Sequence, residues 1–249
     1  MDENKKFRIG LIGAGTIGKA LSEMIKKDME MELVFVYDNI QEKSTVRSVN
    51  EGLNLGVDLA VEAASKEAVM ENAEKVLSKT DFLVLSSSAF ADKKFEQKVI
   101  SACKKNKTRV IVPPGAIIGL DGISAVKKEI TKAVITTTKN PKSFGRKDKN
   151  KTVLFDGTAR KAALAYPANV NVAATLALNS IGFDRTKAKI VSDPKARSNM
   201  HEIEIEGKFG RFFVRVENAP SKNPKTSALA AKTTFEQIKN IRKQASVYP

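Results

Sequence analysis

The chain has very few of the residues that build disulfides and metal centres. It contains one cysteine, Cys103, and one histidine, His201, among 249 residues. A single cysteine excludes an internal disulfide and fits a reducing cytoplasm. Single members of both residue types also exclude multi-cysteine and multi-histidine metal centres. We therefore expect a cytoplasmic protein with no metal site.

Long apolar runs and a secretory leader are missing as well. No stretch approaches the roughly 18 consecutive apolar residues of a transmembrane helix. The first residues, MDENKKF, are charged and lack the apolar segment of a signal peptide. Hydrophobic residues make up 42% of the chain and charged residues 29%, a balance that argues against disorder. The length allows one large or two modest domains, and no membrane association is expected.

Acidic residues are outnumbered by basic ones, 28 against 43, which gives a formal charge of +15. Such an excess fits a nucleic acid, an acidic partner or anionic small ligands. The lysines, however, are spread along the chain in pairs, and no RNA-binding or recognition-helix signature accompanies them. We therefore expect a solvated, lysine-rich surface and no nucleic-acid partner.

The first half alternates strand and helix patterns. Strands are expected at 7–12, 33–37, 58–61, 81–85 and 109–112, and helices at 16–27, 66–77 and 92–106. This alternation implies a parallel sheet with right-handed crossovers. The Pro113-Pro114-Gly115 break marks a domain boundary or hinge. The prediction is an α/β protein with an N-terminal Rossmann domain, a doubly wound parallel sheet, over residues 1–120.

The second half, residues 121–249, predicts a C-terminal α+β domain with an open, mostly antiparallel sheet. Strands are expected at 133–138, 188–191, 201–206 and 211–217, and helices at 158–165, 170–181 and about 226–243. The last helix either belongs to this domain or packs back on the first. The polar, basic stretch 139–151 is expected to be an exposed loop. In the third strand, His201 shares a face with Ile203 and Ile205.

A glycine motif lies between the first strand and the first helix. It reads Gly13-Ala14-Gly15-Thr16-Ile17-Gly18, the G-x-G-x-x-G spacing of dinucleotide-binding loops. In that motif the first glycine permits a tight turn, the second admits the pyrophosphate and the third lets helix and strand pack closely. The amides that open the helix, those of Thr16 and Ile17 among them, then face the phosphates. The alternative is a glycine-rich turn without a ligand.

Other residues at the carboxyl ends of the strands extend this prediction. Asp38 ends the second strand, where a carboxylate accepts hydrogen bonds from ribose hydroxyls, which favours NAD. Lys43 and Arg47 lie just beyond and suit a 2′-phosphate, so NADP stays open. Small residues follow the next two strands, in the segments 62–65, with Ala63 and Ala64, and 86–89. These segments either approach the cofactor or serve only as turns.

His201 is the one side chain whose unperturbed pKa lies near neutrality. Its position on an apolar strand face is typical of a buried core histidine. A general acid or base at the edge of the sheet is the alternative. The pattern alone leaves both interpretations open.

Several longer segments resemble the archaeal and bacterial L-aspartate dehydrogenases. They are Phe155–Leu178, Ile181–Pro194, Asn199–Phe212 and Asn223–Ala231, with GAGTIG, VEAAS and PPGAIIGLDGI in the first half. The resemblance implies NAD(P)-dependent oxidative deamination of L-aspartate to oxaloacetate and ammonia through iminoaspartate, which can feed NAD biosynthesis. It also implies a homodimer, with the second-domain sheet as a candidate interface.

The resemblance also assigns roles to single residues. His201 falls on the active-site histidine, and Ala116 and Asn171 fall on cofactor contacts. Arg160 and Lys225 are candidates for holding the substrate carboxylates. Ser88 is a further substrate candidate, although this chain reads S-S-S-A where relatives often carry S-x-G-A.

Two alternatives stay open at this point, one another enzyme and one a protein of a different class. One is a related two-domain enzyme such as homoserine dehydrogenase or dihydrodipicolinate reductase. The doubled-histidine segment of that reductase is missing here, since the chain has one histidine. The other alternative is a regulatory or nucleic-acid-binding protein that keeps the dinucleotide-binding domain without catalysis.

Overall fold

The computed structural model describes residues 5–167, 170–218 and 228–242. The described residues group into two compact units. The first lies within Met1–Ser86, Lys93–Pro113 and Ala231–Pro249, and the second within Ser87–Asp92 and Pro114–Ala230. The main division therefore falls between Pro113 and Pro114, earlier than the 120/121 boundary expected from the sequence, and the chain passes between the units more than once.

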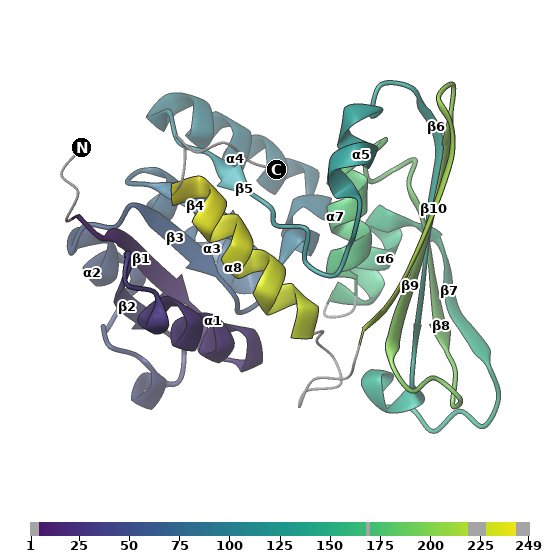
Figure 1. The fold of residues 1–249 in the computed structure, drawn as a ribbon, viewed down its shortest axis with the longest axis horizontal. Coiled ribbons are helices and arrows are strands. Elements are labelled where there is room, and N and C mark those ends of the chain that lie inside the picture. The colour runs from purple at the N-terminus through teal and green to yellow at the C-terminus, as the bar shows by residue number, and fades with distance from the viewer. Residues whose placement is uncertain (1–4, 168–169, 219–227, 243–249) are drawn as a thin grey trace. The chain divides into compact units, whose positions relative to one another are not determined.

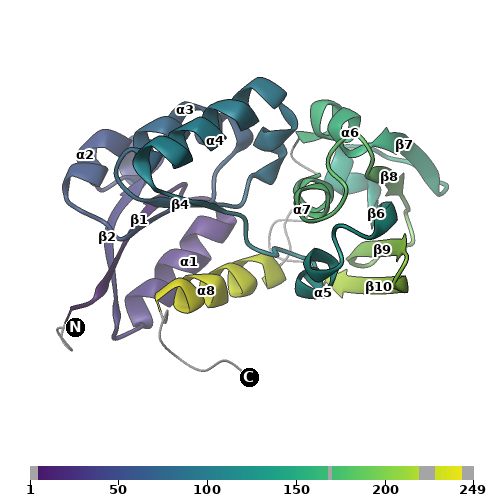
Figure 2. The same cartoon turned by 90° about the horizontal axis from the view of Figure 1, so that it is seen from above.

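The first unit is built on a five-stranded parallel sheet in the order β2-β1-β3-β4-β5. Its strands are β1 (Phe7–Ile12), β2 (Met31–Tyr37), β3 (Leu59–Glu62), β4 (Asp81–Val84) and β5 (Val110–Ile111). Its helices are α1 (Thr16–Lys27), the 3₁₀ turn η1 (Gln41–Lys43), α2 (Val49–Asn54), α3 (Lys66–Leu77), α4 (Lys93–Asn106) and most of α8 (Ala228–Arg242). In Figure 2, α2, α3 and α4 lie over one face of this sheet and α1 and α8 over the other.

Burial on both faces explains why these strands are almost wholly apolar. Ile9, Leu11 and Val61 from the strands form one core cluster with Leu21 of α1 and Ile238 of α8. Fully burying a side chain of this size stabilises the fold by about 1.5–3 kcal/mol. The carboxyl ends of the parallel strands are thereby fixed at one edge of the sheet, where ligands bind in such folds.

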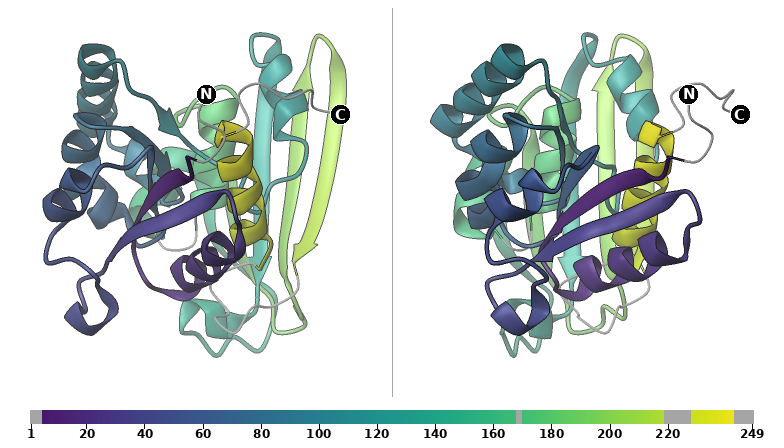
Figure 3. Two further views of the ribbon diagram at one scale, coloured as in Figure 1. Left: turned by 60° about the vertical axis from the view of Figure 1, so that its left-hand side comes forward. Right: turned by 90° about the vertical axis from the view of Figure 1, so that its left-hand side faces the viewer.

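The second unit contains a five-stranded mixed sheet in the order β10-β9-β6-β8-β7 (Figure 1). Its strands are β6 (Ile130–Lys139), β7 (Thr152–Thr158), β8 (Lys187–Ser192), β9 (Asn199–Gly207) and β10 (Gly210–Asn218). Its helices are η2 (Ser87–Ala91), α5 (Leu120–Ala125), η3 (Pro141–Phe144), α6 (Ala159–Ala165) and α7 (Asn171–Asn179). Only β6 and β8 run parallel, so the expectation of a mostly antiparallel sheet is confirmed. The β9–β10 hairpin is the yellow-green ribbon of Figure 3.

Several short elements of the structure were not predicted from the sequence or were predicted with other bounds. The helices α2 and α5 span six residues each, too few to show a helical period. Strand β7 was not expected, because it lies at the sheet edge and its burial does not alternate cleanly. The segment 139–151 is not simply an exposed loop, since Lys139 ends β6 with 4% of its surface exposed. Within the described ranges, no helix combines the length and apolar character needed to cross a membrane.

Candidate active site

The glycine motif forms the turn from β1 into α1, as the sequence predicts. Gly13 has a φ of +106°, and a side chain there would lie 2.7 Å from Ala63 and Ala64. A side chain at Gly18 would collide with the carbonyl oxygen of Gly13. At Gly15, by contrast, nothing lies within 4 Å of the place a Cβ would take. The outer two glycines are thus required by packing, and open space is left over the middle one.

The start of α1 is suited to phosphate binding. Gly15 is its N-cap and supplies no side-chain hydrogen bond, and Gly15 and Thr16 are exposed. The first-turn amides, including that of Ile17, therefore lack a side-chain cap and keep the positive end of the helix dipole open. These amides and the open space over Gly15 fit the pyrophosphate of a dinucleotide.

Asp38 is held against this loop by hydrogen bonds. Its Oδ2 accepts from the amide of Ala14 at 2.7 Å, and its Oδ1 accepts from the amide of Ile40 at 3.0 Å. Burial raises the pKa of Asp38, but these two amides and the positive charge of Lys43 outweigh it, so the pKa lies below its ordinary value. A carboxylate that is ionised near neutral pH therefore lies beside the loop, where it can accept hydrogen bonds from ribose hydroxyls.

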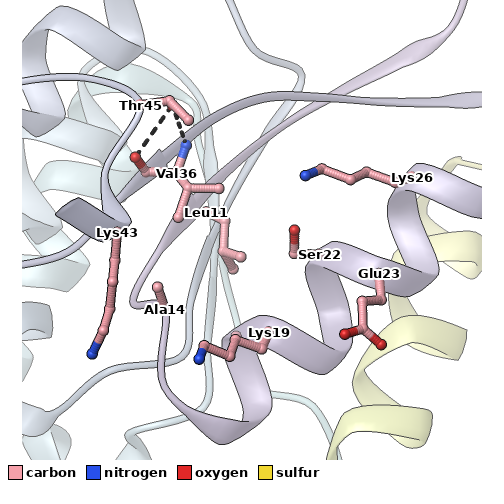
Figure 4. A pocket seen from close by; sticks show the side chains of 10 residues that line it. Leu11, Ala14, Lys19, Ser22, Glu23, Lys26, Val36, Lys43 and Thr45 are labelled. Carbon is pink, nitrogen blue, oxygen red and sulfur yellow. Dashed lines mark hydrogen bonds between the residues drawn. The ribbon is translucent and has the colours of Figure 1, made fainter.

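A hollow beside Asp38 carries positive charge. Figure 4 shows Lys19 and Lys43 on either side of Ala14, in a cavity of about 360 Å³. Arg47 is exposed, and its amide donates to Glu51 at 2.8 Å. The surroundings of Asp38 therefore combine a carboxylate for ribose hydroxyls with two lysines that suit a phosphate.

Glu62, at the end of β3, is a residue that the sequence analysis passed over. It is fully buried and accepts hydrogen bonds from the amide of Ala64 at 2.7 Å and from the amide and hydroxyl of Ser86 at 2.9 and 2.7 Å. Burial raises the pKa of Glu62, and these hydrogen bonds oppose the rise. The side chain ties the ends of β3 and β4 together and so fixes Ala63 and Ala64 against Gly13. An acidic residue at the end of an apolar strand was the available signal.

In the second unit, η2 orients Asn171. The hydroxyl of Ser87 donates to the carbonyl of Asn171 at 2.9 Å, and the amide of Ser88 donates to its Oδ1 at 3.2 Å. Ser88 is buried, and its hydroxyl donates to the carbonyl of Pro167 at 3.4 Å. The contacts of Ser88 are thus with its own unit, where it positions the Asn171 side chain. The substrate role of Ser88 and the cofactor role of Asn171 stay predictions.

The remaining predicted residues lie in different surroundings. Arg160 forms a two-pronged ion pair with Asp184, at 2.6 and 3.1 Å, and also donates to the carbonyl of Ala91. These contacts fasten α6 to η2, and substrate binding by Arg160 stays a prediction. Ala116 is buried in the turn that precedes α5. Lys225 lies outside the described residues.

His201 lies in β9, opposite Thr137 of β6, and 2% of its surface is exposed. Its Nδ1 is 3.0 Å from the Thr137 hydroxyl oxygen. As predicted, it shares its face with Ile203 and Ile205, which are fully buried. Burial and, as the smaller cause, the positive charge of Lys139 together lower the pKa of His201 to about 3. The imidazole is therefore neutral near pH 7.

Lys139 is the second residue that the sequence analysis missed. It ends β6, two positions beyond Thr137, and burial lowers its pKa to about 8. The sequence predicts that the strand ends at residue 138 and places Lys139 in the basic loop that follows, because no residue pattern indicates that β6 continues through it. Among the residues that the structure describes, no three His, Cys, Asp or Glu side chains are arranged to hold a metal ion.

Each half of the chain matches the model of a known protein family. Residues 121–241 match the family model described as "Aspartate dehydrogenase, C-terminal". Residues 13–113 match the model described as "Homoserine dehydrogenase, NAD binding domain". The first match contains His201, Thr137 and Lys139, and the second contains the glycine loop and Asp38.

Similar proteins cover almost the whole chain. L-aspartate dehydrogenases of Methanococcoides burtonii and Archaeoglobus fulgidus are each 42% identical, over 94% of this chain and 97% of theirs. The crystal structure of aspartate dehydrogenase from Thermotoga maritima matches with a TM-score of 0.79 and 31% identity, covering 98% of both chains. A dihydrodipicolinate reductase from Paenisporosarcina, 14% identical with a TM-score of 0.52, shares the fold alone.

Proposed function

Because the chain belongs to the L-aspartate dehydrogenase family, and so is an oxidoreductase that takes NAD or NADP, we propose that it oxidises L-aspartate to oxaloacetate and ammonia. The observation that carries this proposal is His201, a buried and neutral imidazole inside the segment that matches the family. L-aspartate, water and NAD⁺ give oxaloacetate, ammonium, NADH and a proton. The carbon–hydrogen bond at Cα breaks first, and the carbon–nitrogen bond breaks after water has added.

His201 is the base for the addition of water. When bound, the nicotinamide supplies the acceptor for the hydride that leaves Cα, and iminoaspartate remains. Water then attacks the imine carbon, and a base must remove a proton from that water. Nε2 of His201 carries the required lone pair when Nδ1–H donates to Thr137 Oγ1. Burial keeps the imidazole neutral before each turnover, because it disfavours the charged form.

The first unit holds the dinucleotide in this proposal. The amides of Thr16 and Ile17 bind the pyrophosphate over Gly15, and Asp38 accepts from the ribose hydroxyls. Ala116 and Asn171 of the second unit are further cofactor contacts, Asn171 with its side chain oriented by Ser88. A free ribose suits Asp38 better than a 2′-phosphate does. Lys19 and Lys43 reduce that difference, so both NAD and NADP are substrates, with NAD preferred.

The setting of the reaction is also part of the proposal. Iminoaspartate that leaves before water adds would feed NAD biosynthesis, as the family resemblance implies. The single cysteine, half-buried Cys103, fits a reducing compartment, and we place the enzyme in the cytoplasm.

The enzyme acts as a homodimer in this proposal, with the outer face of the second sheet as the interface. Helices α5, α6 and α7 cover one face of that sheet (Figures 1 and 2). The other face carries Phe213, 61% exposed, and Val153, 52% exposed. Around them Lys132 bridges Glu204 and Glu206. Light scattering after size exclusion tests this, and Phe213→Lys should yield monomers.

An absorbance assay for NADH formation tests the proposed activity. The assay offers L-aspartate, L-glutamate, L-alanine and L-homoserine in turn, each with NAD and with NADP. We expect turnover with aspartate and a kcat/KM at least about a hundredfold lower with the others. Preference for homoserine would replace the proposal with the alternative enzyme, and absence of turnover with every amino acid would favour a non-catalytic dinucleotide-binding protein.

A further inference from the structure

In the second unit, four neighbouring strands each place a polar residue in one row across the sheet. The row lies two residues along the strands from His201. Lys139 of β6 is in register with Ser192 of β8, and Asn199 of β9 with Asn218 of β10. Because β6 pairs with β9 with Thr137 opposite His201, Lys139 lies opposite Asn199, and the two pairs form one continuous row. Because side chains two positions apart share a face, the row lies on the same side as His201.

All four side chains are buried, at 6% exposure or less. Beyond His201 and Thr137 this face is apolar, as at Ile135, Ile203 and Ile205. Polar groups in such surroundings are costly unless they find hydrogen-bonding partners. A buried member of this row that finds no partner therefore indicates a use beyond packing.

Asn218 is a member of this row with an unsatisfied hydrogen-bond donor. Its Nδ2 is buried and has no hydrogen-bond partner among the described residues. The Ser192 hydroxyl likewise has no hydrogen-bond partner there, although it lies close enough to the Asp148 carboxyl to help lower its pKa. An amide nitrogen can only donate, so the missing partner of Asn218 is an acceptor.

Lys139 supplies a positive charge in the same row as the Asn218 amide. It lies close enough to His201 for its charge to lower the pKa of the imidazole. A ligand that complements a buried ammonium and an unmatched amide donor carries negative charge and acceptor atoms only, which describes a carboxylate. The proposed substrate has two carboxylates, so it offers such a group to this side of the sheet.

We propose that Lys139 and the side-chain amide of Asn218 bind a carboxylate of the substrate beside His201 and so make the enzyme selective for an acidic amino acid. This inference rests on the proposed function. It also couples binding to catalysis, because a bound carboxylate offsets the charge of Lys139 at the imidazole. His201 then becomes a stronger base only while substrate is present.

Succinate is a suitable probe, since it has two carboxylates and no amine to oxidise. Its affinity is measured by calorimetry at neutral pH on the full chain saturated with NAD. Lys139→Met should weaken succinate binding tenfold or more, as expected for loss of a hydrogen-bonded charge pair. Lys132→Met is the matched control, because Lys132 lies on the same strand but pairs with Glu204 and Glu206 on the opposite face. The Lys132→Met variant should bind succinate with the same affinity as the wild type.

Asn218→Leu separates a ligand role from a structural one. Removing an unmatched buried amide should raise the melting temperature of the free protein. In the same variant, succinate binding should weaken severalfold. A variant that is more stable and binds succinate as the wild type does would remove Asn218 from the proposal.

Turnover of aspartate completes the test. Lys139→Met should raise the KM for aspartate more than tenfold and lower kcat less. Unchanged KM and unchanged succinate affinity in Lys139→Met, in a wild type that oxidises aspartate, would overturn the inference and leave the proposed function standing. A wild type that binds succinate through Lys139 but does not oxidise aspartate would support the carboxylate site and overturn the proposed function.

Discussion

Thr137 and His201 are 64 residues apart in the chain, yet the Thr137 hydroxyl oxygen lies 3.0 Å from Nδ1 of the imidazole. The antiparallel pairing of β6 with β9 sets this contact, because the two residues are direct cross-strand partners. It restrains the orientation of the ring, and when Nδ1–H donates to the hydroxyl, Nε2 is left to act as a base. The chemistry of the one histidine thus depends on a strand far away in the sequence.

Replacing His201 by asparagine should remove the base and keep the fold. We expect kcat with aspartate to fall by about 10² to 10⁴, the usual contribution of a general acid–base residue. NAD binding, measured by calorimetry, should stay near that of the wild type. Glu202→Gln is the control, since Glu202 lies on the other face beside Arg215 and should leave turnover unchanged. A folded His201→Asn protein with the wild-type kcat would contradict the mechanism.

Thr137→Val should reduce activity without removing the base. The variant keeps the shape of the side chain but loses the hydroxyl that orients Nδ1. One such hydrogen bond is worth about 1 kcal/mol, so kcat should fall by about fivefold to tenfold. Thr137→Ser restores the hydroxyl and should recover most of the rate. A wild-type rate in Thr137→Val, together with a loss in Thr137→Ser, would mean that packing of the methyl group, rather than the hydrogen bond, matters at this position.

Lys139→Met should change how stability depends on pH. The pKa of Lys139 is about 8 in the folded protein, below its ordinary value of about 10.4. Between these values the unfolded chain binds more protons than the folded one, so stability rises with pH through that window. Below pH 8 the full cost of burying the charge remains, about 3 kcal/mol.

The variant lacks that cost, so urea unfolding at pH 7 should show it to be more stable than the wild type. The difference should shrink as pH rises from 8 toward 10.5. His201, the titratable neighbour on β9, is neutral in both states throughout this window and adds no slope. A difference that does not vary with pH would show that Lys139 is not a buried cation.

Gly15→Val should abolish dinucleotide binding while the fold survives. Nothing lies within 4 Å of a Cβ at this position, so the side chain of valine begins in open space and extends into the region proposed for the pyrophosphate. Titration with NAD should show no saturable binding, with a near-native circular dichroism spectrum. Gly13→Ala is the contrast, because its φ of +106° and contacts at 2.7 Å predict lost stability instead. Normal NAD affinity in Gly15→Val would reject the loop as the site.

Asp38→Ala should weaken the binding of NAD more than that of NADP. The carboxylate attracts ribose hydroxyls and repels a 2′-phosphate, so its loss affects the two cofactors in opposite directions. Because Asp38 also accepts from the Ala14 amide, the loop should loosen and both affinities should carry a common loss. KM values for both cofactors measure the difference. An equal change for both would show that Asp38 anchors the loop and does not select the cofactor.

Local patterns in the sequence determined most of the first unit. The bounds predicted for β1, α1 and α3 agree with the structure residue for residue. Each has a strong period of its own and clear signals at its ends, such as the glycines before α1 and the Ser65 cap of α3. The place of Asp38 beside the glycine loop also followed, because parallel strands bring their carboxyl ends to one edge.

The properties of His201 were decided by the tertiary structure. The sequence placed the residue on an apolar face, but the hydroxyl at Thr137, the cation at Lys139 and the unmatched amide at Asn218 come from two other strands. Side-chain alternation in a single strand specifies which face a residue takes and not which residues oppose it, since register is set by pairing across the sheet. The pKa of the imidazole depends on burial and on those opposing residues, and both exist only once the strands have paired.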